Sequence, residues 1–552
     1  MERIWLKSYS AGVPAEVDVR AYRSIADLFE RSVAKFSDKP AFIQMGATLT
    51  YAEVDRLSRD FAAYLSEELK LQKGARVALM MLNILQYPIA MLGALRAGYV
   101  VVNCNPLYTA RELERQLADS GAEAIVIIEN FASVLQEALP RTAIKHVITT
   151  RIGDMLDWGQ GTLVNFVVKY VRRLVPAWSI PGAVKFRIAL RRGANLAWTA
   201  PSIEPDDIAF LQYTGGTTGV PKGAMLMHRN IVANLQQHHA HLNAVLREGR
   251  DVVITAIPLF HIYALTVSCL LAIKVGAANV LIANPRDIAG LVKELAKYRF
   301  TCLPGVNTLF KALLDSPEFA LLDFSSFSIA ASGGSALQEA VATKWKAITG
   351  KTLIEAYGLT ETSPVVTCNP TDLAEYNGSC GVPIPSTEVA IKNEQGADLP
   401  VGEAGELCVR GPQVMKGYWN KPEETAKVMT SDGFLQTGDI ATMDEKGFVR
   451  IVDRKKDMIN VSGFKVYPNE VEEVISMHPG VQDVGAVGVP DPVSGEAVKV
   501  IVVKRHPSLT DAELRTHCRK YLTSHKVPQV IEFRDELPKT NLGKILRRAL
   551  RD

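Results

Sequence analysis

The sequence predicts an α/β protein with two domains. The expected large N-terminal domain contains two doubly wound parallel-sheet subdomains and a small β-rich subdomain, and a small α+β C-terminal domain follows it. Three observations carry this prediction: a length of 552 residues, short apolar strands that alternate with helices, and a change of pattern after residue 380. A chain of this length is too long for one ordinary hydrophobic core.

The alternation of strands and helices is clearest over residues 50–130. Helices are expected at 49–69, 86–98 and 109–122, and strands at 76–82, 99–105 and 123–129. Short apolar strands that alternate with helices are typical of a parallel sheet covered on both faces. The same pattern returns over residues 251–353 and predicts the second subdomain.

Shorter strands separated by turns characterise residues 380–452. Strands are expected there at 388–393, 405–411 and 447–453, which predicts the β-rich subdomain. A charged stretch, Asp453–Asp457, then precedes about ninety-five residues, the size of a small domain. That last region should contain strands at 484–490 and 499–504 and a helix at 511–525. We therefore expect an N-terminal domain at 1–455 and a C-terminal domain at 456–552.

Composition excludes several classes of protein. Apolar residues make up 47% of the chain and charged residues 22%, as in a soluble globular protein. A net charge of +3 is small for this length and argues against nucleic-acid binding. The seven cysteines are scattered and never form a CxxC pair, which argues against disulfides or zinc and fits a reducing cytosol. We expect neither a signal peptide nor a membrane span.

A glycine-rich loop within Tyr213–Leu226 is the strongest chemical signal. Its first eleven residues contain four glycines, three threonines and Lys222. Glycine lets backbone N–H groups converge on an anion, threonine hydroxyls add neutral donors, and lysine adds a point charge. A buried strand at 208–213 should precede the loop and a helix at 228–237 should follow it. The pattern predicts a phosphate site; the other interpretation is a surface turn.

Two further segments offer groups suited to a nucleotide. Tyr357 can stack on a base, Thr360 can donate to a phosphate, and Glu361 is a hard oxygen ligand suited to Mg²⁺. Asp439, expected after a tight glycine turn, can accept from both ribose hydroxyls, and Arg454 offers a second ribose or phosphate partner. Each segment taken singly also fits a structural turn.

Two more segments indicate the rest of a pocket. Residues 331–337 form a second glycine-rich loop, with Gly333 and Gly334, expected beside an adenine and a carbonyl group. His261 lies in the segment 258–265, at the end of an expected strand. A lone histidine on an apolar strand is more often a core residue than a catalytic one, which favours a pocket-lining position.

Residues 151–193 form a basic insert that does not fit the α/β pattern. The insert contains eight basic and two acidic residues, a net of +6. Within 163–175, apolar residues follow one helical stripe while Lys169, Arg172 and Arg173 lie on another side. Such a helix is suited to an anionic membrane surface. The alternative is a helix packed on the core with a solvated basic face.

The order of these motifs resembles that of the adenylate-forming enzymes, the superfamily of acyl-CoA synthetases, luciferases and peptide-synthetase adenylation domains. The whole chain looks like the bacterial long-chain fatty acyl-CoA synthetases. The segment Asp453–Glu472 resembles the signature of that family, and residues 538–548 resemble a C-terminal motif that supplies Lys544. The basic insert is similar to one in those enzymes, which are typically peripheral to the inner membrane.

The resemblance implies a reaction in two steps. A fatty carboxylate attacks the α-phosphorus of ATP to give acyl-adenylate and pyrophosphate, and coenzyme A then displaces AMP. The implied cofactor is Mg²⁺, the co-substrates are ATP and CoA, and the substrate is a long-chain fatty acid. The implied location is the cytoplasm, with peripheral attachment to the inner face of the plasma membrane. A homodimer is compatible with the resemblance, and no nucleic-acid partner is expected.

The resemblance also implies roles for individual residues. The implied catalytic residues are Lys544, Thr360 and His261, the implied Mg²⁺ ligand is Glu361, the implied hinge is Lys456, and Gly463 is implied to lie on the CoA path. The residues implied to bind ATP and AMP are Thr214, Gly215, Gly216, Thr217, Thr218, Gly219, Lys222, Gly333, Gly334, Tyr357, Gly358, Thr360, Asp439 and Arg454. The residues implied to line the acyl tunnel are Tyr263, Leu265, Gly305, Val306 and Phe310. The small domain is implied to rotate about the hinge between the two steps.

Other functions remain open at this stage. A medium-chain or aryl acid CoA ligase of the same superfamily would share the adenylation chemistry. A peptide-synthetase unit would normally be followed by a carrier domain. A non-enzymatic acyl or nucleotide sensor is the alternative from a different class, although a sensor need not keep Lys544.

Overall fold

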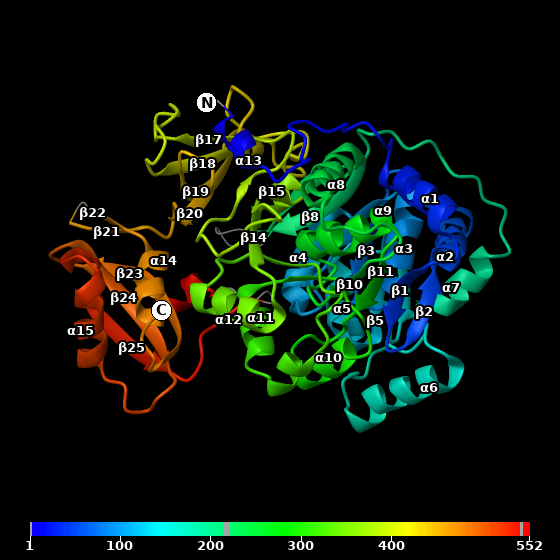
Figure 1. Cartoon of the computed structure of the whole chain (residues 1–552). Coiled ribbons are helices and arrows are strands. Elements are labelled where there is room, and N and C mark those ends of the chain that lie inside the picture. The colour runs from blue at the N-terminus through cyan, green and yellow to red at the C-terminus, as the bar shows by residue number, and fades with distance from the viewer. Residues whose placement is uncertain (1–2, 215–220, 463, 541–544, 552) are drawn as a thin grey trace.

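The computed structural model describes residues 3–214, 221–462, 464–540 and 545–551. Figure 1 shows the large N-terminal part at the centre and right, and the C-terminal part from β21 onward as a separate unit at the left. The predicted fold class is confirmed, because two mixed sheets with helices are followed by a small antiparallel sheet and a C-terminal α+β unit.

The first large sheet has seven strands within the described residues, in the order β7-β6-β5-β3-β4-β8-β9. The strands are β3 (Arg76–Met80), β4 (Val100–Asn103), β5 (Ala124–Ile128), β6 (His146–Thr150), β7 (Val184–Lys185), β8 (Ile208–Thr214) and β9 (Lys222–Met227). The pairs are parallel from β7 to β8, whereas β9 runs antiparallel to β8. The sequence predicted β8 and the helix after the loop, but not β9 between them.

Helices cover both faces of this sheet. In β3, Val77 and Leu79 belong to the buried cluster that includes α2 (Tyr51–Ala63) and α3 (Gln86–Arg96). Ala78 and Met80 belong to a second cluster, with α4 (Ala110–Ser120) and α5 (Ala132–Ala138). Successive residues of a strand point to opposite faces, so this alternation confirms the doubly wound arrangement.

The second large sheet has nine strands in the part of the chain that the structure describes, in the order β16-β15-β14-β13-β12-β10-β11-β1-β2. The strands are β1 (Pro40–Gln44), β2 (Ala47–Thr50), β10 (Val252–Thr255), β11 (Ala278–Leu281), β12 (Cys302–Gly305), β13 (Ile329–Gly333), β14 (Leu353–Gly358), β15 (Val365–Cys368) and β16 (Val382–Pro383). Strand β1 pairs in parallel with β11, more than two hundred residues later. The N-terminal hairpin thus joins the second sheet although the first sheet follows it directly in sequence.

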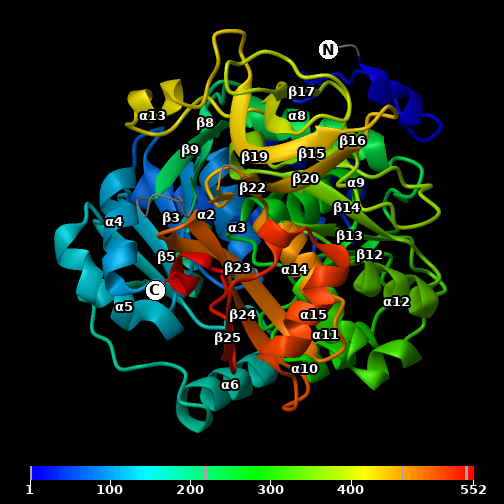
Figure 2. The same ribbon diagram turned by 90° about the vertical axis from the view of Figure 1, so that its left-hand side faces the viewer.

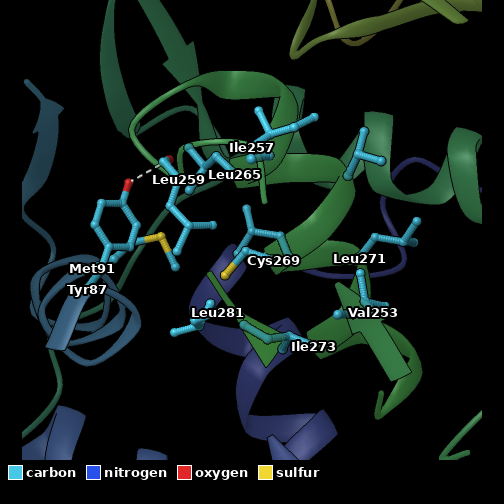
Figure 3. Close-up of a cluster of buried hydrophobic side chains, with 14 of the residues drawn as sticks. Tyr87, Met91, Val253, Ile257, Leu259, Leu265, Cys269, Leu271, Ile273 and Leu281 are labelled. Carbon is cyan, nitrogen blue, oxygen red and sulfur yellow. Dashed lines mark hydrogen bonds between the residues drawn. The ribbon is translucent and has the colours of Figure 1, made fainter. Parts of the chain in front are cut away.

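The two sheet subdomains share one hydrophobic core. Figure 3 shows Tyr87 and Met91 of α3 beside Leu259, Leu265 and other side chains of the second subdomain. The buried Tyr87 hydroxyl donates a hydrogen bond of 2.9 Å to the Leu259 carbonyl. This packing fixes the two sheets relative to one another, so residues from both can contribute to one site.

The β-rich subdomain is an antiparallel sheet of β17 (Glu388–Lys392), β18 (Gly405–Arg410), β19 (Leu435–Met443) and β20 (Val449–Arg454). The expected turn before Asp439 is instead part of β19. Gly438 has φ +73°, and the β18–β19 register shifts between Glu406 and Cys408. A glycine with positive φ in a strand is typical of a bulge, which redirects the next side chain without ending the strand.

The C-terminal unit has its own core. Strands β21 (Ile459–Val461), β22 (Phe464–Val466), β23 (Val481–Asp491), β24 (Gly495–Lys504) and β25 (Val530–Arg534) form its sheet, with α14 (Pro468–Ser476) and α15 (Asp511–Tyr521) beside it (Figure 2). Buried residues of α14, α15 and the strands form a cluster separate from the N-terminal cores. The predicted strands and helix of this region are confirmed.

The remaining helices connect or flank these sheets. They are α1 (Ile25–Phe36), α6 (Trp158–Phe166), α7 (Phe186–Gly193), α8 (His228–Leu242), α9 (Leu271–Val275), α10 (Ile288–Leu295), α11 (Asn307–Leu314), α12 (Glu339–Thr349) and α13 (Pro422–Ala426). A search of the described residues finds no helix whose length and apolar character would let it cross a membrane.

The basic insert divides into two parts. Helix α7 packs on α2, where the Phe186 and Phe61 ring centroids lie 5.1 Å apart. Helix α6 and the π-helical turn Val167–Val171 instead extend along the lower edge of the molecule in both views (Figures 1 and 2). The apolar stripe of α6 and this turn is exposed, with Leu163 and Tyr170 62% and 61% accessible. Of the two alternatives for this helix, the one in which its apolar stripe packs on the core does not match the structure.

Candidate active site

Three predicted nucleotide-binding side chains meet where β14, β19 and β20 approach one another. The Tyr357 hydroxyl donates to Asp439 Oδ2 at 2.6 Å, and Arg454 Nε lies 3.0 Å from Asp439 Oδ1. Asp439 and Arg454 are directly paired across β19 and β20. Burial, reinforced by the Asp439 charge, raises the pKa of Tyr357 well above its ordinary value, and the same charge raises the pKa of Arg454. The phenol therefore stays protonated and the guanidinium charged.

Two of the predicted phosphate-binding residues, Thr214 and Lys222, lie beside this cluster. Lys222 begins β9 opposite Thr214, the last residue of β8. The Lys222 ammonium pairs with Glu424 of α13 and lies 5.2 Å from the centroid of the Tyr418 ring. The Tyr418 hydroxyl donates to Glu361 Oε1 at 2.8 Å, so one tyrosine joins the loop lysine to the predicted metal ligand.

Some predicted residues lie outside the described residues. These are Gly215, Gly216, Thr217, Thr218 and Gly219 of the loop, Gly463 of the expected CoA path, and Lys544. Their predicted roles stay predictions. The described residues at the loop ends, Thr214 and Lys222, are paired across β8 and β9.

The segment after β14 is held tightly. A Cβ atom on Gly358 would lie 2.0 Å from the Pro364 carbonyl oxygen, so only glycine fits there. The single turn Thr360–Thr362 follows, and its predicted phosphate donor Thr360 is half-buried. The Met415 N–H donates to the Glu361 carbonyl at 2.8 Å, which fixes the position of the predicted metal ligand.

The donor set around Glu361 fits a magnesium ion held together with phosphates. Glu361, Thr437, Gly438 and Lys455 are among the residues that line a cavity of about 270 Å³. The described residues contain no cluster of three or more His, Cys, Asp or Glu side chains that could hold a metal ion by themselves. Mg²⁺ commonly uses one or two carboxylates together with substrate phosphates and water, and both Glu361 and Glu406 line this cavity.

Predicted acyl-site residues gather at the carboxyl ends of β12 and β13. The Tyr263 hydroxyl donates to the Ala331 carbonyl at 2.9 Å and lies 3.3 Å from the Gly305 carbonyl. The Tyr263 ring packs against Gly333, where a Cβ atom would lie 3.1 Å away, and the Phe310 ring packs against Gly305 in the same manner. These glycines leave room for aromatic rings.

The other predicted pocket residues occupy different depths. Val306 approaches Gly334, which has φ +78° and would be strained by a side chain. Leu265 is fully buried in the core cluster of Figure 3. His261 is half-buried, and its Nδ1 accepts a 3.2 Å hydrogen bond from the Tyr263 N–H. Lys456 lies exposed in the turn between β20 and β21.

The sequence analysis missed three residues of this site. Tyr418 and Glu424 come from a segment two hundred residues after the loop, and an isolated bridge between Tyr418 and Ala224 brings them to Lys222. Glu355 accepts a 3.2 Å hydrogen bond from the Leu337 N–H and so holds the second glycine-rich loop. The signal for Glu355 was a carboxylate in an otherwise apolar strand; Tyr418 and Glu424 had no local signal.

We expect Glu424→Gln to lower KM for ATP about two- to fivefold, because the ligand-free Lys222 no longer pairs with a carboxylate that competes with phosphate. Hydrogen bonds from Lys222 and Lys427 lower the pKa of Glu424 to about 2, so the carboxylate is charged at any working pH. Steady-state kinetics with varied ATP measure the effect. Glu423→Gln, on the same helix, is the control, and an unchanged or raised KM in Glu424→Gln contradicts the expectation.

A second expectation concerns pH. Burial raises the pKa of Glu355 from an ordinary 4.5 to about 8. The folded protein then binds more protons than the unfolded chain between these values, so the contribution of Glu355 to stability falls as pH rises through this window. Glutamine does not titrate, so the Tm of Glu355→Gln relative to wild type should rise by a few degrees from about pH 5 to about pH 9. A Tm difference that does not vary with pH contradicts this assignment.

Comparisons with known proteins show which family the chain is similar to. The model of the family described as AMP-binding enzyme matches residues 29–419, and the model described as AMP-binding enzyme C-terminal domain matches residues 470–544. The chain is 58% identical over 552 residues to a long-chain-fatty-acid–CoA ligase of Escherichia coli O157:H7, and covers 98% of it. It is 39% identical to a protein of the same name from Bacillus subtilis (strain 168), with 98% covered.

A solved structure shows the same overall arrangement. ATP-bound MatB from Rhodopseudomonas palustris superposes with a TM-score of 0.82 at 29% identity, covering 95% of this chain and 98% of that one. Fold and site together define a nucleotide-binding α/β enzyme with a smaller C-terminal unit. The chain belongs to the AMP-binding enzyme family, and the resemblance found in the sequence is confirmed.

Proposed function

We propose that this protein is a long-chain-fatty-acid–CoA ligase, which converts a fatty acid, ATP and CoA to acyl-CoA, AMP and pyrophosphate. The observation that carries the proposal is the junction of Tyr357, Asp439 and Arg454 beside Lys222 and Glu361. This junction supplies an aromatic ring, a carboxylate for ribose and groups for a triphosphate. The name shared by the full-length relatives supports the choice of acyl substrate.

The first half-reaction forms a mixed anhydride. A carboxylate oxygen of the fatty acid attacks the α-phosphorus of ATP, the bond from that phosphorus to the bridging oxygen breaks, and pyrophosphate leaves. Negative charge builds on the α-phosphate, so preorganised cations and donors should account for most of the acceleration. Lys222 and Thr214 hold the leaving pyrophosphate with the rest of the glycine-rich loop, Thr360 donates to the α-phosphate, and Lys544 stabilises the transition state.

Binding of the nucleotide is assigned to described residues on β13, β14, β19 and β20 and on the segments that follow β13 and β14. Asp439 accepts from the ribose hydroxyls, and Arg454 holds that carboxylate in position. Tyr357 stacks on the base, and Gly333, Gly334 and Gly358 let the backbone approach it. Glu361 would hold Mg²⁺, which neutralises phosphate charge when bound.

The second half-reaction forms the thioester. The CoA thiolate attacks the acyl carbonyl carbon, the carbon–oxygen bond to the phosphate breaks, and AMP leaves. We assign residues 1–455 to the nucleotide- and acyl-binding domain and 456–552 to a small domain that rotates about Lys456 between the steps. Rotation carries Lys544 away and admits CoA past Gly463.

The acyl chain is assigned to the space around Tyr263, Gly305, Val306 and Phe310, with Leu265 farther inside. All five residues are buried. His261 lies next to this group and lines the carboxylate end.

The test of this function is AMP release with ATP, Mg²⁺ and CoA across saturated acids from short to long chain, plus one cinnamic acid. A maximum at long chains supports the proposal. A maximum at medium-chain or aromatic acids would support the adenylation chemistry but would mean that the substrate is one of those acids and not a long-chain fatty acid. Nucleotide or acyl binding without AMP release supports a sensor instead.

We also propose that the enzyme attaches peripherally to the inner face of the plasma membrane through α6. Six large apolar side chains of this region are 54–83% exposed: Trp158, Leu163, Phe166, Tyr170, Val171 and Leu174. Lys169, Arg172 and Arg173 lie among them. Exposed apolar area rimmed by basic groups matches the acyl chains and anionic headgroups of a lipid surface.

Co-sedimentation with anionic vesicles tests this attachment. We expect Leu163→Ser/Phe166→Ser and Arg172→Glu/Arg173→Glu each to lower the bound fraction severalfold, because one removes apolar burial and the other reverses charge. Arg519→Glu/Lys520→Glu, an exposed pair on α15, is the matched control. Equal binding by the insert variants and the control excludes α6 as the docking surface. A separate sedimentation measurement of the protein alone, without vesicles, gives its oligomeric state and so tests the homodimer that is compatible with the family resemblance.

A further inference from the structure

Arg547 occupies the centre of an ionic network at the junction between β20 and the C-terminal unit. Its side chain is 14% exposed. Its guanidinium lies 3.0 Å from Asp453 Oδ1, 2.9 Å from Glu472 Oε2 and 3.7 Å from Asp457 Oδ2, and it also donates to Asn469 Oδ1. Three carboxylates and an amide therefore converge on one arginine.

The partners of Arg547 belong to both sides of the turn at Lys456. Asp453 pairs with Ile440 in the β19–β20 ladder, so it is fixed to the β-rich subdomain. Asn469 and Glu472 lie on α14 of the C-terminal unit. Asn469 also donates from its N–H to Asp453 Oδ2 at 2.7 Å. Two residues of the C-terminal unit thus hold one carboxylate of the other part.

Burial makes this network sensitive to the loss of one partner. The Asp453 side chain is 0% exposed and that of Glu472 16%. Burial raises the pKa of each carboxyl, which Arg547 opposes. A buried charge that loses its partner is strongly destabilised, so the network favours an arrangement in which the contacts form together.

The arrangement seen here keeps β21 and β22 on the outer side of the C-terminal unit. In Figure 1 both strands lie at the far left, beyond α14, and in Figure 2 they face the viewer, away from β8 and β14. Lys465 of β22 pairs at 3.4 Å with Glu394, an exposed residue after β17, and not with a site residue. Under the proposed function, CoA must pass this hairpin, so the orientation is suited to adenylate formation.

We infer that the contact between Arg547 and Asp453 stabilises the orientation of the C-terminal unit seen here, and we call this contact the orientation lock. Arg547 is then a positioning residue for the first half-reaction. The inference rests on the proposed function. Rotation of the C-terminal unit about Lys456 leaves the contacts of Arg547 with Asn469 and Glu472 intact, because all three residues move together. The same rotation separates Arg547 from Asp453, which stays with β19. Arg547 is also three residues after Lys544 in the sequence, so under the proposed function loss of the Arg547–Asp453 contact should affect the step assigned to this lysine.

The experiment measures each half-reaction separately in the full-length enzyme. Adenylate formation is followed as pyrophosphate release without CoA, and thioester formation starts from supplied acyl-adenylate and CoA. We expect Asp453→Asn to lower the ratio of the first rate to the second about tenfold, because the orientation held by the Arg547–Asp453 contact is no longer favoured. Arg547→Lys, which keeps a cation in the buried site, should change the ratio in the same direction.

Arg551→Gln is the matched control. Arg551 lies 3.3 Å from Asp457 in the same turn but is 45% exposed and has no contact with Asp453. In Arg551→Gln, the ratio of the rate of adenylate formation to the rate of thioester formation should equal that of the wild type. Equal losses in both half-reactions for Asp453→Asn and Arg547→Lys would mean a purely structural role, and an unchanged ratio would mean no lock; either overturns the inference. Failure of the wild type to perform the two half-reactions would instead overturn the proposed function.

Discussion

Asp439→Asn is expected to lower kcat/KM for ATP about a hundredfold, because the carboxylate that should accept from both ribose hydroxyls loses its charge. Asp439 is 4% exposed and bonded to Tyr357 and Arg454 on its two oxygens. An asparagine oxygen can still accept from Tyr357, but the amide cannot pair with the guanidinium. Steady-state kinetics with varied ATP measure the change.

Asp444→Asn provides the control for this variant. Asp444 is exposed in the turn after β19 and accepts hydrogen bonds from the N–H groups of Lys446 and Phe448. Its substitution should leave the kinetics with ATP unchanged. A decrease of less than about threefold in Asp439→Asn, with the fold intact by Tm, would remove Asp439 from the nucleotide site.

Lys544→Ala is expected to lower the rate of adenylate formation by about 10²- to 10³-fold and to leave thioester formation from supplied acyl-adenylate nearly unchanged. The physical reason is that the α-phosphorus is attacked only in the first step, whereas in the second step the attack is at the acyl carbon. Lys544 lies outside the described residues, so the expectation rests on the C-terminal motif. Pyrophosphate release and CoA acylation, measured separately, give the two rates.

Lys520→Ala, an exposed lysine of α15, is the control for charge on the same part of the chain. Neither rate should change in that variant. An equal loss of rate in both half-reactions of Lys544→Ala contradicts the assignment of Lys544 to adenylate formation alone. It does not contradict the proposal that the enzyme forms an acyl-adenylate.

Local pattern was sufficient to predict most helices and strands. Helix α2 begins at a capping box formed by Thr50 and Glu53, and its apolar spacing is visible in the sequence. Strands β3, β4 and β5 were predictable because each is a short apolar run between helices. Tyr357, Asp439 and Arg454 could be assigned to one site because each belongs to a motif of the resembled family, and the structure brings them together.

Non-local contacts account for what the sequence did not predict. The placement of β1 beside β11 depends on pairing between distant segments, which no local period encodes. Strand β9 was not predicted because it begins with Lys-Gly, a dipeptide typical of loops, although most of its later apolar residues are buried. The bulge at Gly438 resembled a turn because both use a glycine with positive φ. Glu424 reaches Lys222 only through tertiary packing.

The end of β20 carries two neighbouring residues with different tasks. Arg454 bonds to Asp439 and Asp453 bonds to Arg547, and successive side chains of a strand point to opposite faces. Under the proposed function, nucleotide binding and the orientation of the C-terminal unit would therefore both act on the end of β20, from its two faces. Thermodynamic linkage between binding events and conformation is reciprocal, so an orientation that binds nucleotide more tightly is stabilised by nucleotide to the same extent. ATP binding at Arg454 and Asp439 would then shift the orientation of the C-terminal unit through the neighbouring Asp453, and no separate regulatory element would be needed.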